Sequence, residues 1–354
     1  MSRRAAAVAA VTALLLSIGL LVGLETGAAS AGHAATGATM STVATVPEPV
    51  VTTVAAPTTT QTLPGSGKTV RLGDMNTPEQ FIIGALYGVA LSYEGYRVIP
   101  NRNADFQPDN LKALRDGSLD LFADYLGTWN SGVAHLHHRY RTLRASFGAA
   151  RLFALHSGYV LLPPTPFSDT SCVAVLAQYA RANHVYSIPE LARGAPIIFG
   201  APLRFQTSGD GLPALEQSYH LHPGYVQRIA DNVQYWWLRT GNVQAAYCST
   251  TDPLLAGTKY VALQDPKQIF GHGNIIAVTT PKVLTDEGPA FANTIRQVDR
   301  LLTLKAMRGL NAEYQLGHHD LNQIATQFLE GNGVLPPARY APVPTTTATT
   351  PTGT

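Results

Sequence analysis

The sequence is poor in cysteine and carries almost no excess of charge of either sign. Its two cysteines, Cys172 and Cys248, are too few for a zinc ribbon or an iron–sulfur cluster. Because 25 Lys and Arg residues nearly balance 23 Asp and Glu residues, a nucleic-acid-binding surface is not expected. With 45% hydrophobic residues and a mean hydropathy of +0.03, the composition indicates a globular protein rather than a polytopic membrane protein or a wholly disordered chain.

The first 31 residues have the pattern of an export signal. Arg3 and Arg4 precede an apolar run over residues 5–24, and Ala29-Ser30-Ala31 supplies small residues for cleavage. The apolar run also approaches the roughly 20 residues that span a bilayer, so an uncleaved anchor is the alternative. Either pattern predicts an exported protein, periplasmic or associated with the cell envelope, at the outer face of the cytoplasmic membrane.

Two segments rich in threonine and proline flank the central part of the chain. Residues 32–67 form one of them, with 8 Thr and 4 Pro between positions 41 and 64, and residues 336–354 form the other. Such compositions bury too little apolar surface to offset the entropy of ordering, so we expect a disordered linker and a disordered tail. The remaining 270 residues or so, 68–335, suffice for two lobes of about 100–150 residues each.

Hydrophobic periodicity and capping residues predict alternating strands and helices in this central part. Thr77 has the features of an N-cap, because Pro78 follows it at the first helical position and Gln80 stands three residues after it. The predicted strands are 69–72, 96–99, 119–122, 172–176, 196–199 and 275–278. Two amphipathic helices are expected over 289–308 and 320–330. This alternation is typical of an α/β fold with mostly parallel sheets and crossover helices.

The order of motifs resembles that of substrate-binding proteins of osmoprotectant ABC transporters, the glycine betaine, choline or carnitine binders of the ProX and OpuC type. The segments that carry the resemblance are 73–80 (GDMNTPEQ), 113–121 (ALRDGSLDL), 124–128 (DYLGT), 169–171 (DTS), 205–212, 249–252 (STTD) and 307–311. The resemblance implies a type II periplasmic-binding-protein fold, in which two α/β lobes close on a ligand in an interlobe cleft. Lobe I would comprise 68–168 plus 276–335, and lobe II would comprise 169–275.

In such proteins tyrosine rings surround a quaternary ammonium group, because ring faces attract a cation that has no N–H to donate. Tyr125 and Tyr225 fall on cage tyrosines, whereas Ser171 and Ser249 occupy two other ring positions. Tyr247 could replace one of these rings, since residues two apart on a strand point to the same face. The ligand-binding residues that the resemblance implies are Tyr125, Thr128, Asp169, Thr170, Ser171, Asp210, Tyr225, Tyr247, Ser249, Thr250 and Asp252.

The departures from the family pattern leave the ligand open. Loss of two rings at about 2 kcal/mol each would weaken a quaternary-ammonium site nearly a thousandfold. The two basic residues that would hold a carboxylate are replaced by Met75 and Ser208, with Arg204 four residues before the latter. Either nearby aromatics such as Trp129 and Trp236 complete the site, or its lining suits a different solute.

Other groups of residues give weaker indications. The histidines at 135, 137 and 138 lie in a polar, arginine-rich stretch and have no acidic partner in it, so a solvated surface is favoured over a metal site. The segment 208–211 lacks the Gly-x-Ser-x-Gly pattern of a nucleophile elbow. No enzyme activity, cofactor or metal is therefore expected. Cys172 and Cys248 would form a disulfide if they lay on adjacent strands, and two unpaired core thiols are the alternative.

These observations predict the exported solute-binding component of an ABC importer. It would capture an osmoprotectant such as glycine betaine, or another small quaternary-amine-like solute, and deliver it to a membrane permease that a cytoplasmic ATPase drives. Tyr125 and Tyr225 would pack against the ligand, while Asp169 and Asp210 would orient or brace the site. The alternative is a cell-envelope protein of the same fold that binds or senses a different small molecule and has no transport role.

Overall fold

The computed structural model describes residues 62–101 and 107–336. The predicted export signal, most of the predicted linker and nearly all of the predicted tail lie outside these residues. Within the described ranges, every helix is too short or too polar to cross a membrane.

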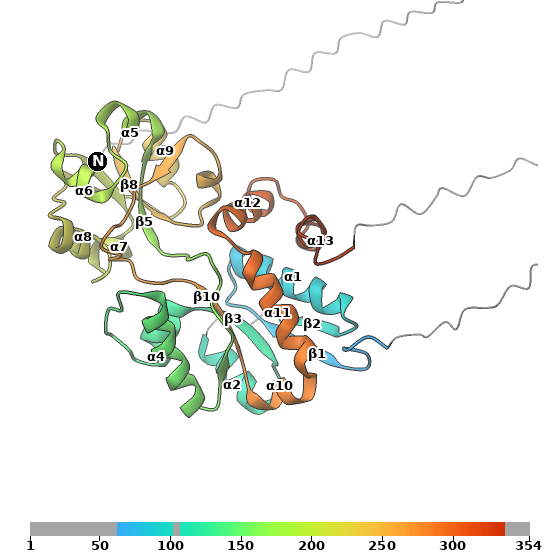
Figure 1. Cartoon of the computed structure of the whole chain (residues 1–354). Coiled ribbons are helices and arrows are strands. Elements are labelled where there is room, and N and C mark those ends of the chain that lie inside the picture. The colour runs from blue at the N-terminus through green and yellow to red at the C-terminus, as the bar shows by residue number, and fades with distance from the viewer. Residues whose placement is uncertain (1–61, 102–106, 337–354) are drawn as a thin grey trace, which may run out of the picture. The chain divides into compact units, whose positions relative to one another are not determined.

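The described strands form two five-stranded sheets, named A and B here (Figure 1). Sheet A has the order β2-β1-β3-β10-β4 and sheet B the order β7-β6-β8-β5-β9. The strands of sheet A are β1 (Thr69–Gly73), β2 (Arg97–Asn101), β3 (Leu121–Tyr125), β4 (Val160–Leu161) and β10 (Ile275–Thr279). Those of sheet B are β5 (Ser171–Leu176), β6 (Ile198–Ala201), β7 (Tyr225–Arg228), β8 (Ala245–Ser249) and β9 (Tyr260–Ala262).

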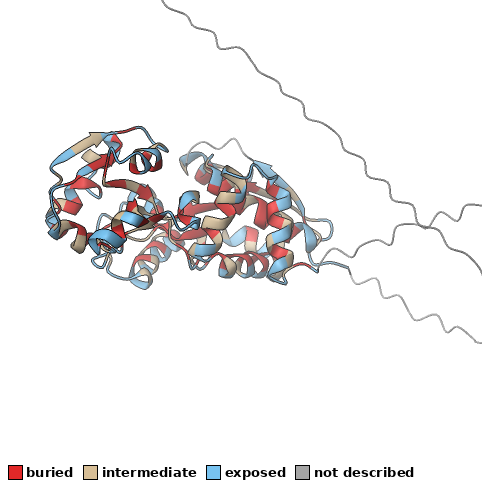
Figure 2. Cartoon of the chain, turned by 90° about the horizontal axis from the view of Figure 1, so that it is seen from above, coloured by how far each residue is buried: buried red, intermediate tan, exposed pale blue. Residues whose placement is uncertain are grey.

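Each sheet has its own helices and its own hydrophobic core (Figures 1 and 2). The helices that accompany sheet A are α1 (Pro78–Tyr93), α2 (Gln107–Asp116), α3 (Leu126–Thr128), the π-helix η1 (Trp129–Val133), α4 (Leu143–His156), α10 (Pro281–Glu287), α11 (Pro289–Leu301), α12 (Leu304–Gln315) and α13 (Leu321–Gly331). Those of sheet B are α5 (Ala177–Asn183), α6 (Ile188–Arg193), α7 (Leu203–Thr207), α8 (Leu212–Tyr219), α9 (Gln234–Arg239) and the 3₁₀ helix η2 (Pro253–Ala256). Figure 2 shows the buried residues concentrated on the strands and on the helix sides that face them.

Local sequence accounts for the start of α1, the helix that later contributes to the site. The Thr77 side chain accepts a hydrogen bond from the Gln80 backbone N–H at 3.4 Å, and Pro78 occupies the first turn. The predicted cap is therefore present. Ile82, Ile83 and Leu86 of this helix are buried in the core over sheet A, where each fully buried aliphatic side chain contributes about 1.5–3 kcal/mol.

Two expectations about the elements were wrong. The helix expected over 289–308 is two helices, because the Thr303 hydroxyl accepts from the Ala306 N–H at 3.2 Å and starts α12 anew. Buried residues on both sides of the break, such as Val298 and Met307, made the apolar pattern look continuous. The sheets are also mixed rather than mostly parallel. β10 runs antiparallel to β3 and β4, and β5 runs antiparallel to β8 and β9.

Two crossover segments, 162–170 and 263–274, connect the sheets and are hydrogen-bonded to each other. Asn274 Nδ2 donates to the Thr165 carbonyl at 2.9 Å, and the Asp169 N–H donates to the Gly273 carbonyl at 3.0 Å. A Cβ atom at Gly273 would lie 1.7 Å from the Asp169 carbonyl oxygen, so only glycine fits there. This pairing holds the backbone of Asp169 just before the start of β5 in sheet B.

Candidate functional site

Side chains from both sheets meet at the sheet B end of the crossover segments. Tyr125 is the last residue of β3, and Glu79 lies in the first turn of α1. Asp169 precedes β5 by two residues, and Ser249 ends β8. Because β5 and β8 pair with Ser171 opposite Ser249, Asp169 and the residues after Ser249 come to the same edge of sheet B.

A hydrogen-bond network joins these elements. The Tyr125 hydroxyl donates to Glu79 Oε1 at 3.1 Å, and Asn311 Nδ2 of α12 donates to Glu79 Oε2 at 2.9 Å. The same amide donates to the Thr251 carbonyl at 3.0 Å, and Ser249 Oγ donates to Asp169 Oδ1. The Thr251 backbone N–H donates to Ser249 Oγ at 3.2 Å. We call Glu79, Tyr125, Asp169, Ser249, Thr251 and Asn311 the junction cluster.

Burial dominates the electrostatics of the junction cluster. Desolvation and, to a smaller extent, the charge of Asp169 raise the pKa of Glu79 to about 7, against the opposing effect of hydrogen bonds from Thr251, Asn311 and Tyr125. Desolvation also raises the pKa of Asp169, against hydrogen bonds from Ser249 and Thr251. Low-dielectric surroundings disfavour the charged form of a carboxyl group. The cluster therefore contains two neighbouring acids whose pKa values are both raised, that of Glu79 to about 7.

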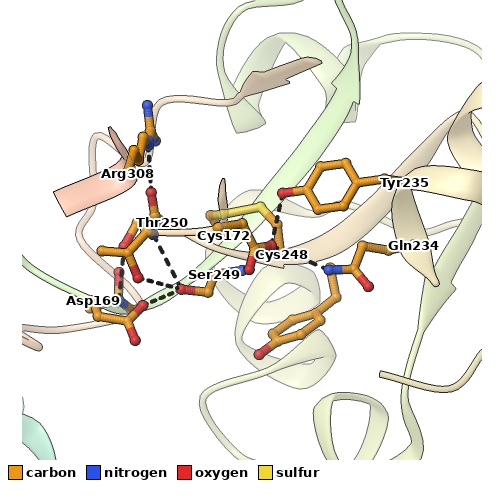
Figure 3. The surroundings of a disulfide bond; sticks show 12 residues. Asp169, Cys172, Gln234, Tyr235, Cys248, Ser249, Thr250 and Arg308 are labelled. Atoms are coloured by element: carbon orange, nitrogen blue, oxygen red, sulfur yellow. Dashed lines mark hydrogen bonds between the residues drawn. A yellow bond between two sulfur atoms is a disulfide. The ribbon is translucent and has the colours of Figure 1, made fainter. Parts of the chain in front are cut away.

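A disulfide between Cys172 and Cys248 lies directly beside the cluster (Figure 3). It joins facing residues of β5 and β8 whose Cα atoms are 4.9 Å apart, which resolves the alternative of two free thiols in favour of the bond. Figure 3 shows Asp169 and Ser249 on one side of the disulfide and Tyr235 on the other. The covalent bond thus holds together the two strand ends that present the polar residues.

Asp252 braces the turn after β8. Its Oδ2 accepts hydrogen bonds from the Tyr235 hydroxyl at 2.8 Å, from Gln234 Nε2 at 3.2 Å and from the Ser249 backbone N–H at 3.1 Å. Arg308 of α12 secures the same turn, because its Nε donates to the Thr250 carbonyl at 2.7 Å. Asp252 therefore positions its neighbours, and the Thr250 hydroxyl is likewise occupied by the Ser168 carbonyl and the Thr170 N–H.

A basic side chain lies over Tyr247 on the same strand as Ser249. The Arg204 guanidinium is 4.8 Å from the Tyr247 ring centroid and donates to the Tyr247 hydroxyl at 2.9 Å. It also donates to Asp231 Oδ1 at 2.7 Å. A pocket of about 550 Å³ adjoins these residues and is lined by Pro202, Leu203, Arg204, Arg228, Ile229, Ala230 and Asp231. Tyr247 and Ser249 are two residues apart on β8 and point to the same face. Because Tyr247 contacts Arg204 and Ser249 contacts Asp169, Tyr247 lies between the basic and the acidic parts of the site.

The structure does not bring every expected ligand-binding residue to this place. Tyr225 is the first residue of β7, opposite Ile198 at the start of β6, and is 59% exposed. Because β6 and β8 are parallel, the start of β7 and the end of β8 lie at opposite ends of sheet B. Asp210 is exposed and accepts from Ser208, and Thr128 is exposed at the end of α3. None of these three belongs to the junction cluster.

The aromatic residues considered as replacement rings have other roles. Trp129 is fully buried and packs edge-on against Phe153 and Tyr159 in the core beside sheet A. Trp236 is half exposed and contacts Trp237. Among the described residues, no set of three His, Cys, Asp or Glu side chains is arranged to hold a metal.

Sequence reasoning missed Glu79, Asn311 and Arg308. Glu79 lies within the motif at 73–80, between the Pro78 and Gln80 that predict the start of a helix. Asn311 closes the motif at 307–311. The signal in both cases was a polar residue close in sequence to apolar core residues on a helix, Ile82 for Glu79 and Leu310 for Asn311, and both polar residues are buried.

Comparison with known proteins shows the family of the chain. Residues 68–331 match the family described as the substrate binding domain of ABC-type glycine betaine transport systems. A glycine-betaine-binding protein of Pseudomonas aeruginosa is 25% identical over 280 residues, 76% of this chain and 89% of the relative. The glycine betaine-binding protein YehZ of Escherichia coli is 23% identical over 283 residues, 75% of this chain and 90% of the relative.

Solved structures show the same fold. The crystal structure of a glycine betaine/carnitine/choline ABC transporter superposes with a TM-score of 0.69 at 20% identity, covering 75% of this chain and 99% of that chain. The apo structure of YehZ gives a TM-score of 0.67 at 22% identity, with the same coverage. The fold is that of periplasmic binding proteins, with two α/β lobes built on sheets A and B. This chain belongs to the family of substrate-binding domains of ABC-type glycine betaine transport systems.

Proposed function

We propose that this protein captures a small zwitterionic quaternary ammonium solute, glycine betaine or a close analogue, outside the cytoplasmic membrane. It passes the solute unchanged to an ABC permease that a cytoplasmic ATPase drives. One observation carries the proposal. The site has an acidic end at the junction cluster and a basic end at Arg204, and Tyr247 lies between them. Membership in the family and the names of the two relatives support the same ligand class.

Each end of the site matches one part of such a solute. At the acidic end, the Tyr125 ring and the neighbouring carboxyl groups attract a trimethylammonium group, which offers no N–H for hydrogen bonding. At the basic end, the Arg204 guanidinium is a planar donor suited to a carboxylate. A neutral polyol would satisfy neither end.

The first test is an isothermal titration of the purified protein with glycine betaine, choline, carnitine and a polyol. We expect saturable binding of the quaternary ammonium compounds and none of the polyol. At 100 times its dissociation constant, a bound ligand should also stabilise the fold by about 2.7 kcal/mol, which a thermal melt detects. Binding of the polyol alone would favour the sensing or binding protein with a different ligand.

Arg204 is expected to distinguish ligands that carry a carboxylate from those that do not. Arg204→Gln removes the cation at the basic end, and a hydrogen bond to a charged group contributes about 1.5–3 kcal/mol. Glycine betaine should therefore bind at least about tenfold more weakly, whereas choline should change less than about twofold. Titrations of both ligands measure the difference.

Arg193→Gln provides the matched comparison, because Arg193 is an exposed arginine at the end of α6. It should leave both affinities unchanged. Equal losses of glycine betaine and choline binding in Arg204→Gln would contradict the assignment of Arg204 to the carboxylate.

A further inference from the structure

The two acids of the junction cluster have no basic partner. Glu79 is 6% exposed, and neither it nor Asp169 forms an ion pair with any residue in the described part of the chain. Buried carboxylates are normally paired with a cation or held neutral. Here the polar atoms around them are hydroxyl and amide groups, which donate hydrogen bonds but bring no positive charge.

Among the described residues, the charged and titratable groups on the surrounding elements do not supply a cation to Glu79 and Asp169. Arg308 of α12 interacts with Asp252 and Tyr235 instead, and Arg204 of α7 is engaged by Asp231 and Tyr247. The groups that face Glu79 and Asp169 from β3, β8 and the turn after β8 are Tyr125, Tyr247 and Asp252, none of them a cation. Asp124 adjoins Tyr125 in β3, but its carboxyl group accepts from Gln107 on the opposite face of the strand.

A second observation in the same network is an excess of negatively polarised oxygen, which a cation attracts even without an N–H group. Among the described residues, Asn311 Oδ1 has no hydrogen-bond partner, although the residue is only 2% exposed; its Nδ2 bonds to both Glu79 and Thr251. An unpaired buried acceptor costs about 1–3 kcal/mol. The cluster therefore holds acceptor oxygens and acidic groups in excess of the donors and cations around it.

We propose that Glu79 and Asp169 together supply the negative charge that receives the ligand's ammonium group, and that binding of this cation expels a proton held by the two carboxyl groups. The inference rests on the proposed function. It explains how the site recognises a cation although Ser171 and Ser249 stand where rings were expected. Ser249, which has no ring, instead donates a hydrogen bond to Asp169.

The direction of the pH dependence follows from this arrangement. Without ligand, burial keeps the pKa of Glu79 at about 7 and raises that of Asp169, so the pair holds a proton below neutral pH. A bound cation favours the charged form and lowers these pKa values. At a pH between the pKa of the free protein and the lowered pKa of the ligand complex, binding therefore releases the proton. By linkage, the affinity rises as the pH rises through that range. We expect at least about a tenfold tighter dissociation constant at pH 8 than at pH 5.5.

The experiment measures proton release directly. The wild-type protein is titrated with choline, which has no carboxylate, at pH 6.5 in phosphate and in imidazole, two buffers that differ in ionisation enthalpy. The difference between the apparent binding enthalpies gives the number of protons released, which should be close to one. The dissociation constant is then measured from pH 5.5 to pH 8. Neither the quaternary ammonium nor the hydroxyl group of choline titrates in this range.

Two variants assign the proton to the pair. Glu79→Gln keeps the shape of the side chain and should reduce both the proton release and the pH dependence by at least half. Glu313→Gln removes an exposed carboxyl group on the outer part of α12, where it pairs with His319, and should change neither. If Glu79→Gln does not fold, Asp169→Asn replaces the other carboxyl group of the pair and should reduce the proton release and the pH dependence in the same way.

The outcomes separate this inference from the proposed function. Choline binding with the same enthalpy in both buffers and no pH dependence would overturn the role of the pair while leaving the ligand class intact. Proton release that persists unchanged in Glu79→Gln would overturn the assignment to Glu79. Failure of choline, glycine betaine and carnitine to bind at every pH would overturn the proposed function and this inference with it.

Discussion

Replacing both Cys172 and Cys248 with alanine is expected to lower the free energy of unfolding by about 4 kcal/mol. The disulfide closes a loop between residues 76 positions apart, and a loop of this size restricts the unfolded chain by about that amount. In a protein of this size the melting temperature should fall by about 10 °C. Chemical denaturation and thermal melts of the double variant and the oxidised wild type measure the loss.

The same substitution should also affect the site, because the bond joins the strand ends that present Asp169 and Ser249. We expect ligand affinity to fall severalfold in the double variant below its melting temperature. The reduced wild-type protein is the matched comparison, since it loses the bond but keeps both sulfur atoms in the core. A double variant as stable as the oxidised protein would show that the loop is held by packing alone.

Tyr125→Ala is expected to weaken binding of glycine betaine and choline at least tenfold. A desolvated contact between a cation and an aromatic ring contributes about 2 kcal/mol, which corresponds to about thirtyfold in affinity. The substitution also removes the hydroxyl group that donates to Glu79. Titration of a variant whose circular dichroism and melting curve show a folded protein measures the effect.

Two further tyrosine variants identify what Tyr125 contributes. Tyr125→Phe keeps the ring and loses only the hydrogen bond to Glu79, so its affinity should stay within about threefold of wild type. Tyr225→Ala tests the second tyrosine that the family resemblance singled out. Because Tyr225 is exposed at the opposite end of sheet B, we expect no more than a twofold change. A larger loss of affinity in Tyr225→Ala than in Tyr125→Ala would contradict the proposed site, because the ligand would then lie near the start of β7 and not at the junction cluster.

Several properties of this protein follow from sequence alone. The N-cap at Thr77 is a local signal, and α1 begins directly after this residue. The strands at 69–73, 171–176 and 275–279 coincide closely with apolar, β-prone runs. Such features depend on residues within about four positions of each other, so the pattern of elements and the family can be recognised without a structure.

The tertiary structure decided which residues form the site. Glu79 and Asn311 are 232 positions apart and meet only because α1 and α12 pack together beside sheet A. The facing positions of Cys172 and Cys248 depend on the antiparallel register of β5 and β8. Tyr225 lies away from the cluster because β7 begins at the far end of sheet B. Strand register and helix packing arise from contacts between distant segments, and no local pattern in the sequence specifies them.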